Sequence, residues 1–257
     1  MKGFKDKKGK FHPTGQYSAL KKSDMRYKKS VSVASGGASD ISKSEMEKII
    51  QTKTNTIPDP DYGLFIANGY DDLIVEPKNP EVTKAYNQFI DETIEQAREI
   101  NKMGIEFEPT LSHEYKNANE MFDDIDDNKH LYYRPSDNDY EGLEDHPLFK
   151  MTDFKNMNGE KMRANDIFRA VHDVNGHWKS KGQLTPVGEQ KAFVEHKKMY
   201  SAEAIKALFT ETQGQGNWVN FNPKSGKKNR DFQDIGELEK LKYPKQKAVL
   251  FPDGIVF

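Results

Sequence analysis

The chain has 257 residues, 35% of them hydrophobic and 31% charged, so part of it is not expected to pack into a core. The absence of cysteine excludes disulfides, thiolate metal sites and a cysteine nucleophile. No stretch approaches the ~20 apolar residues of a membrane-spanning helix, and the basic N-terminus is not followed by the apolar run of a secretory signal. We therefore expect no membrane partner.

The net charge of −2 conceals a strong asymmetry. Residues 1–30 carry ten Lys or Arg against two Asp, whereas residues 111–150 carry eleven acidic against four basic side chains. Residues 1–60 are predicted to form a basic extended arm and linker, because the first 45 hold few large aliphatic side chains to offset the entropy of ordering. Such an arm would order against a partner, either nucleic acid or an acidic protein surface. The alternative is a solvated tail.

A short helix is predicted over 41–52, and the Pro-Asp-Pro-Asp run at 58–61 is predicted to precede a compact domain over 61–257. The clearest helix pattern follows. Apolar residues recur at helical spacing between the candidate cap Asn79, with Pro80 after it, and Gly104.

Two short strands are predicted over 105–108 and 130–134, on either side of an acidic helix over 114–127, and they are expected to pair into a small sheet. An acidic loop over 136–150 follows.

The last hundred residues are predicted to be mostly helical. Helices are expected over 164–174, 186–199 and 202–209, a short extended piece over 218–221, and a polar loop over 222–230. The expected fold class is therefore α+β and mainly α: a helical domain with a small two-stranded sheet and an extended N-terminal arm.

The chemistry is expected at a His-Asp-Val-Asn-Gly-His string, which begins at His172 and ends at His177, together with Glu211. Two imidazoles and one carboxylate can occupy one face of a divalent metal, as in non-haem Fe(II) sites. The same ligands with Zn(II) would make a hydrolytic site with an open water position. Positions five apart differ by about 140° on an α-helix, so Gly176 is expected to let the backbone turn or unwind and bring the second imidazole round. The alternative is ordinary side chains near helix ends.

Three further residues are candidates for catalysis. Glu189 and His196 are seven apart and can share a helix face, where they would supply a further ligand or a proton-transfer pair. Arg169 precedes His172 by three residues, and its guanidinium is suited to a substrate carboxylate or phosphate. The alternatives are a polar helix face for the first two and a structural ion pair for Arg169.

The two motifs together resemble the metal site of the aromatic amino acid hydroxylases. His172, Gly176 and His177 match the family's first motif, and Thr210, Glu211 and Gly214 match its second motif loosely. The resemblance implies that His172, His177 and Glu211 bind iron.

A longer resemblance, from about residue 62 to the C-terminus, is to an uncharacterised domain of bacteriophages and mobile elements. It is carried by residues 164–173, 188–196, 199–201, 210–215 and 218–221. That domain occurs in large multi-domain phage proteins and as a stand-alone virion-associated chain. The resemblance implies a phage protein located in the virion or the host cytoplasm, with virion proteins as partners.

Two functions are therefore predicted. In the first, the domain is a metal-dependent oxygenase or hydrolase that uses one Fe(II) or Zn(II) ion. In the second, it is a structural virion protein of the capsid, portal or tail whose arm binds neighbouring subunits and whose site is inactive. Convergence of the ligands would favour the first.

Overall fold

The computed structural model describes residues 3–5, 11–13, 60–76, 78–112, 114–136, 145–226 and 242–256. In the N-terminal part it describes two short strands, β1 (Gly3–Lys5) and β2 (Phe11–Pro13), which pair antiparallel. The rest of the predicted arm, the predicted helix over 41–52, most of the acidic loop and residues 227–230 lie outside the described residues.

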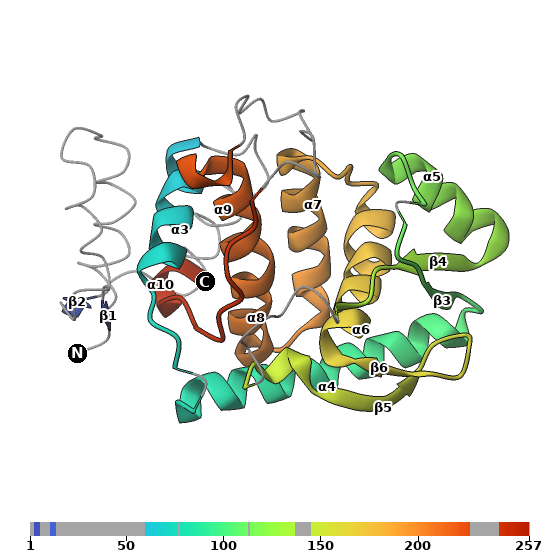
Figure 1. Ribbon diagram of the computed structural model, residues 1–257, viewed down its shortest axis with the longest axis horizontal. Coiled ribbons are helices and arrows are strands. Elements are labelled where there is room, and N and C mark those ends of the chain that lie inside the picture. Colours follow the sequence, from blue (N-terminus) through green and yellow to red (C-terminus); the bar gives the residue numbers. More distant parts are fainter. Residues whose placement is uncertain are drawn as a thin grey trace.

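The described part of the chain is mainly helical, with small sheets, which confirms the predicted fold class (Figure 1). Its α-helices are α3 (Pro60–Asp72), α4 (Pro80–Lys102), α5 (Ala118–Asp123), α6 (Ala164–His172), α7 (Pro186–His196), α8 (Ala202–Phe209), α9 (Gln215–Phe221) and α10 (Asp253–Val256). Helices α5, α6 and α8 each continue as a π-helical segment, over Asp124–Asn128, Asp173–Trp178 and Thr210–Gly214 respectively.

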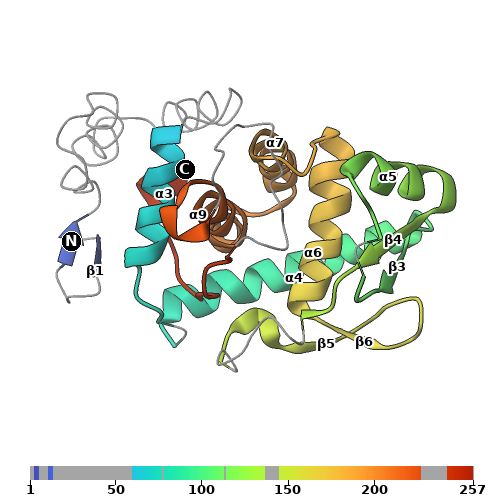
Figure 2. The ribbon, with the colours of Figure 1, turned by 45° about the horizontal axis from the view of Figure 1, so that its top comes forward.

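The longest helix, α4, has the predicted ends. The Asn79 side chain accepts a hydrogen bond from the Glu81 backbone N–H at 2.9 Å, and Pro80 occupies the first turn. Gly104, just beyond the end, has φ +85°, a conformation that favours glycine. The apolar face of α4 is buried against α6 and α8, which α4 crosses (Figure 2).

The predicted strand pair is confirmed. β3 (Glu106–Pro109) and β4 (His130–Tyr133) are parallel, with Glu106 opposite His130. Parallel pairing requires a crossover, and α5 with its π extension supplies it. A second, antiparallel pair was not predicted: β5 (Met151–Lys155) and β6 (Lys161–Arg163), which leads directly into α6.

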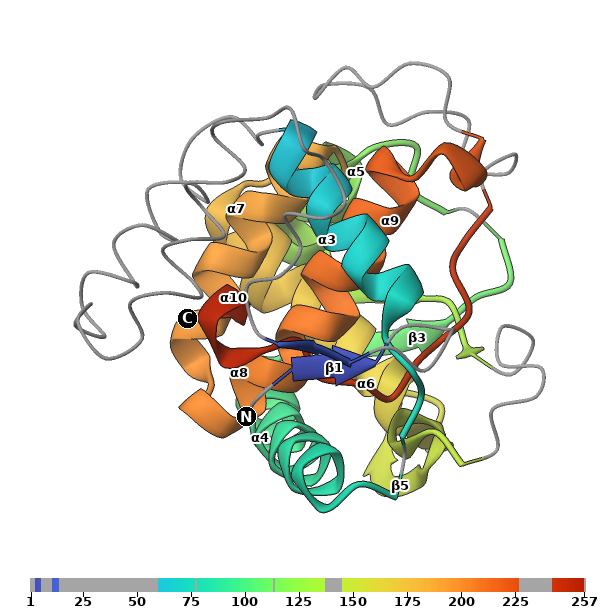
Figure 3. The ribbon, with the colours of Figure 1, turned by 90° about the vertical axis from the view of Figure 1, so that its left-hand side faces the viewer.

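The prediction of an extended piece over 218–221 is wrong, because these residues belong to α9. Trp218 and Phe221 are both buried, and α9 packs on α3, seen from the side in Figure 3. Residues three apart point to opposite faces of a strand but to one side of a helix, so only a helix buries both aromatic rings. Gly63 of α3 allows the contact, since a Cβ there would lie 2.3 Å from the Phe221 ring.

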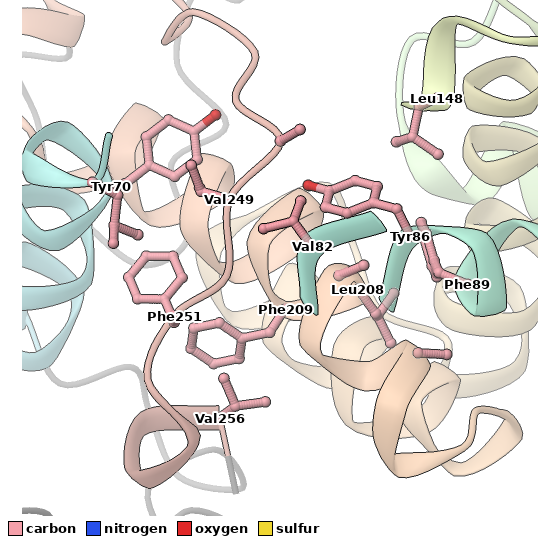
Figure 4. Packing of buried hydrophobic residues seen from close by; sticks show 14 of the residues in the cluster. Tyr70, Val82, Tyr86, Phe89, Leu148, Leu208, Phe209, Val249, Phe251 and Val256 are labelled. Atoms are coloured by element: carbon pink, nitrogen blue, oxygen red, sulfur yellow. The ribbon is translucent and has the colours of Figure 1, made fainter. Parts of the chain in front are cut away.

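Within the described part of the chain, two hydrophobic clusters form the core. In the larger one, the C-terminal segment 242–256 lies along α3 and α8, and Phe251 packs on Phe209 with ring centroids 5.2 Å apart (Figure 4). The smaller cluster lies around β3, β4 and α5. Helix α6 contributes to both, with Phe168 in the larger and Ile167 and Val171 in the smaller. None of the described helices is long and apolar enough to cross a membrane.

Candidate metal centre

The two histidines of the motif converge without a break in the helix. Helix α6 ends at His172 and the chain continues as the π segment Asp173–Trp178. In a π-helix the hydrogen bonds join residues five apart, so His177 comes to lie beside His172. Their rings are 5.1 Å apart and nearly perpendicular, at 86°. Of the two backbone changes predicted at Gly176, a turn or an unwinding, the structure has no turn there but a local change of helix type.

Gly176 has a different role from the predicted one. A Cβ at this position would lie 3.1 Å from the Ala192 Cβ, 3.1 Å from the Ala192 carbonyl oxygen and 3.1 Å from the His172 ring. The absence of a side chain therefore lets α7 approach the π segment closely. That approach brings Glu189, on α7, to the histidines.

Glu189 completes a three-residue group with the two histidines. Its Oε2 lies 3.3 Å from His177 Nε2 and 3.9 Å from His172 Nε2. One donor atom from each of the three residues lies within 4.8 Å of the others, so one metal ion can be held among them. We call His172, His177 and Glu189 the metal group. The start of helix α7 is capped by the Thr185 side chain, which accepts a hydrogen bond from Gly188 N–H at 3.2 Å.

His172 is oriented by a chain of hydrogen bonds. Gln96 Oε1 accepts a hydrogen bond from His196 Nε2 at 3.0 Å, and His196 Nδ1 lies 2.9 Å from His172 Nδ1. Burial lowers the pKa of His196 far below its usual value, so this ring is neutral. With its Nε2 protonated, His196 accepts at Nδ1, and His172 donates there. The lone pair of His172 is therefore on Nε2, the atom that faces Glu189.

The ring of His177 is oriented in a similar way, by a backbone carbonyl. Its Nδ1 donates to the Gly182 carbonyl at 2.9 Å, which leaves Nε2 for the metal group. A metal-binding histidine commonly donates its second N–H to a carbonyl or carboxylate in this manner. Both imidazoles thus present Nε2 to the same point. His172 Nε2 is buried and has no hydrogen-bond partner among the described residues.

The charges of the group are coupled. Burial alone would lower the pKa of His177, but the Glu189 carboxylate, together with Asp173 and the Gly182 carbonyl, raises that pKa to about 9. Burial alone would raise the pKa of Glu189, but the two histidines together hold the pKa of that carboxyl far below its usual range. Burial raises the pKa of Asp173, and electrostatic interactions with His177 and His172 partly offset this effect. Metal binding would therefore replace a proton shared between His177 and Glu189.

Glu211, the predicted third ligand, lies outside this group. Its carboxylate accepts hydrogen bonds from Tyr86 Oη at 2.5 Å and from Gln215 Nε2 at 2.6 Å, and His146 Nε2 is 3.7 Å away. Burial raises the pKa of Glu211 to about 7, although both hydrogen bonds and the charge of Arg169 act against it. Through these contacts Glu211, on the π segment after α8, links that segment to α4 and to the residues before β5.

The other predicted catalytic residues have distinct positions. His196 orients His172, as described above. Arg169 is half-buried on α6. Burial raises the pKa values of Asp166, Asp173 and Glu211, and the charge of the nearby Arg169 partly offsets the rise at each of them. Its predicted contact with a substrate anion stays a prediction.

The metal group is accessible to solvent on the side that faces α9. Glu189 keeps 39% of its side chain exposed and borders a small hollow, called here the amide hollow. The hollow is lined by Pro186, Glu189, Gln190, Thr212, Gln213, Gly216, Asn217, Asn220 and Phe221. Apart from Glu189, these side chains are uncharged, and most can form hydrogen bonds. Ligands would reach the metal from this side.

Sequence reasoning missed Gln96. The sequence did contain a signal for Gln96, namely a polar residue on the buried side of a predicted helix. Gln96 is next to Ala97 and one turn from Thr93 and Ile100, which are all buried. A polar side chain there needs a buried partner, and His196 provides it.

No protein-family model, no curated protein and no solved structure matches this chain.

Proposed function

We propose that the domain is a metal-dependent enzyme that binds one divalent ion through His172, His177 and Glu189. The observation that carries the proposal is the state of His172. Its Nε2 is buried without a hydrogen-bond partner among the described residues, while its Nδ1 is held by His196. A buried, unsatisfied lone pair costs free energy, and a metal ion at the point shared with His177 and Glu189 removes that cost.

We favour Fe(II) and oxygenation as the chemistry. Two imidazoles and one carboxylate leave several positions of an octahedral ion open. When bound, Fe(II) supplies sites for O2 and for a substrate atom. Glu189, which the sequence predicted as the general base of a hydrolase, lies instead among the three candidate ligands. This position favours oxygenation, because an oxygenase has less need of a separate carboxylate base. The amide hollow beside Glu189 has a volume of about 20 Å³ and accepts only a water-sized group, so it supports a substrate that presents a small, uncharged, hydrogen-bonding end there.

Zinc-assisted hydrolysis is the second candidate, and Asp173 is the observation that favours it. This half-buried carboxylate interacts electrostatically with both histidines. A bound Zn(II) lowers the pKa of its water towards neutrality. Asp173 would then be the base that accepts the proton, in place of Glu189.

The biological setting is proposed from the sequence alone. The resemblance to phage domains supports a virion-associated protein, and the basic residues 1–30 support a contact with nucleic acid or an acidic subunit. The rival function, a structural virion protein with an inactive site, predicts virion incorporation without metal. If the arm binds nucleic acid, the affinity of the full chain for DNA should fall steeply with salt.

Metal content tests the enzyme proposal. Protein purified without chelator should carry close to one equivalent of iron or zinc, and apo-protein should take up one equivalent again. His172→Ala and His177→Ala should each lose most of this binding. His130→Ala is the matched control, because His130 is held by Asp124 and Glu108 on the β3–β4 side of the domain. Unchanged metal content in both motif variants would exclude the site.

The identity of the metal is tested separately. Fe(II)-loaded protein with open positions should bind nitric oxide and give the electron paramagnetic resonance signal of an iron–nitrosyl complex. Tight binding of Zn(II) with no such iron complex would favour hydrolysis.

A further inference from the structure

The helix that carries His172 and His177 ends in an unusual turn. Its last helical residue is Ser180, and Lys181 follows with φ +50°, in the left-handed region that favours glycine. Within the described part of the chain, Lys129 is the one other non-glycine residue with a positive φ. A left-handed lysine costs free energy, and it persists where the surrounding structure requires the turn.

The turn is a Schellman motif, and both of its hydrogen bonds are present. Gly182 N–H donates to the His177 carbonyl at 3.0 Å, and Lys181 N–H donates to the Trp178 carbonyl at 3.3 Å. The left-handed position of this motif is usually occupied by glycine, but here it is Lys181, and the glycine comes one residue later. The left-handed conformation therefore does not explain why residue 182 is glycine.

Gly182 is explained by a close approach to α7. A Cβ on Gly182 would lie 2.7 Å from the Gly188 carbonyl oxygen, and a Cβ on Gly188 would lie 1.6 Å from the Gln183 carbonyl oxygen. Backbone therefore packs directly on backbone where the Schellman turn meets the first turn of α7. Gly188 immediately precedes Glu189, so this contact places the turn next to the residue that supplies the carboxylate of the metal group.

The position of Gly182 determines the orientation of the His177 ring. The two residues are joined twice, because Gly182 N–H donates to the His177 carbonyl and His177 Nδ1 donates to the Gly182 carbonyl at 2.9 Å. The His177 side chain is buried, so a displaced Gly182 carbonyl would leave its Nδ1 without an acceptor, at a cost in free energy. A ring that rotates to find another acceptor would move Nε2 out of the metal group.

We propose that Lys181 and Gly182 are positioning residues of the metal centre. The left-handed backbone of Lys181 directs the Gly182 carbonyl back to the His177 ring. The contact of Gly182 with α7 keeps His177 and Glu189 at a spacing that one metal ion can bridge. This inference rests on the proposed metal-binding function, and it assigns the backbone of a turn outside the metal group to the control of that site.

Two substitutions of Lys181 test the backbone conformation. Lys181→Gly favours the left-handed region, whereas Lys181→Val disfavours it, because valine is β-branched. The ion pair of Lys181 with Asp126 is exposed and contributes little, and both variants lose it. They differ mainly in the cost of the left-handed turn, which corresponds to a factor of roughly ten. In metal-free protein, the Gly182 amide should therefore exchange its hydrogen roughly tenfold faster in Lys181→Val than in Lys181→Gly.

Zn(II) binding to the full chain should follow the same order. Lys181→Val should bind Zn(II) roughly tenfold more weakly than Lys181→Gly, and the NMR signal of the His177 Nδ1 proton should weaken only in Lys181→Val. Lys129, with φ +56°, follows the π segment after α5 and is the matched control. Lys129→Gly and Lys129→Val should differ in stability but not in metal affinity.

The outcomes separate this inference from the function on which it rests. Equal Zn(II) affinities of the two Lys181 variants, or equal exchange rates of their Gly182 amides, would overturn the positioning role. If Lys181→Val does not fold, Gly182→Ala replaces it and should likewise weaken Zn(II) binding and the His177 ring signal. Wild-type protein that binds no metal would refute the proposed function. The His177 ring signal of the metal-free variants would then still decide whether the turn holds the ring.

Discussion

The Nδ1 atoms of His172 and His196 lie 2.9 Å apart, so one ring must donate and the other accept. Gln96 Oε1 settles the direction, because it accepts from His196 Nε2. The result is a one-way chain from α4 through α7 to the metal group, in which each ring nitrogen has a defined role. Groups that orient a ligand in this way typically contribute 10- to 100-fold to metal affinity.

The first prediction concerns this chain. Gln96→Leu removes the acceptor for His196 and should lower metal affinity by roughly 10- to 100-fold, while Gln96→Glu keeps an acceptor and should retain most of it. Gln88→Leu, on the exposed side of the same helix, is the control. Metal titration of the three variants gives the comparison. Equal affinities for Gln96→Leu and Gln88→Leu would show that the chain does not act on the metal.

The second prediction separates the two candidate carboxylate ligands. Glu189→Gln should lower metal affinity at least roughly 100-fold, more than an outer-shell change would. Glu211→Gln should leave it within a few-fold, since Glu211 binds Tyr86 and Gln215 instead. Metal content and circular dichroism should be measured together on both variants. The reverse order of effects would restore Glu211 as the ligand.

The third prediction is a pH dependence of stability. Burial raises the pKa of Glu211 from 4.5 to about 7, so ionising the carboxyl opposes folding. The contribution of the neutral Glu211 carboxyl to the free energy of unfolding is full below about pH 4.5. It is lost as the pH rises through 7, and the loss amounts to roughly 3 kcal/mol. His146 acts in the opposite direction, because burial lowers its pKa to about 4 and its contribution is lost as the pH falls.

The difference between wild type and Glu211→Gln isolates the Glu211 contribution from that of His146. Urea unfolding of metal-free protein at pH 5 and pH 8 should show the variant gaining stability relative to wild type at the higher pH. A difference in stability that stays constant between the two pH values would mean that Glu211 titrates normally.

The fourth prediction concerns Gly176. Gly176→Ala places a Cβ 3.1 Å from the Ala192 backbone oxygen, so α7 must move away and carry Glu189 with it. We expect a loss of roughly 1 to 3 kcal/mol of stability from overpacking and a clear drop in metal affinity.

Gly216→Ala is the matched control, because a Cβ at this helical position would meet nothing within 4 Å. The control should be neutral or stabilising by up to about 1 kcal/mol. Thermal unfolding and metal titration of both variants provide the measurement. Metal binding that is unchanged in Gly176→Ala would mean that the close approach of α7 does not position Glu189.

The sequence alone determined the elements whose signals are local. Asn79, Pro80 and Gly104 mark the ends of α4, and the period of its apolar residues defines its buried face. The β3–β4 pair and helices α6, α7 and α8 were also predictable, because side-chain periodicity reflects which face is buried. The two histidines were predictable as candidate ligands from their residue type and from the glycine between them.

Only the tertiary structure decided which carboxylate joins them. The π-helical segment that brings the histidines together packs closely on α7 at Gly176, and no sequence period indicates it. Once residues five apart lie together, the nearest carboxylate comes from α7 and not from the helix that carries Glu211. Likewise, Gln96 is 100 residues from His196 in the chain, and only the packing of α4 against the end of α7 makes it the acceptor. Local patterns predict helices, but the positions of ligands depend on how those helices pack.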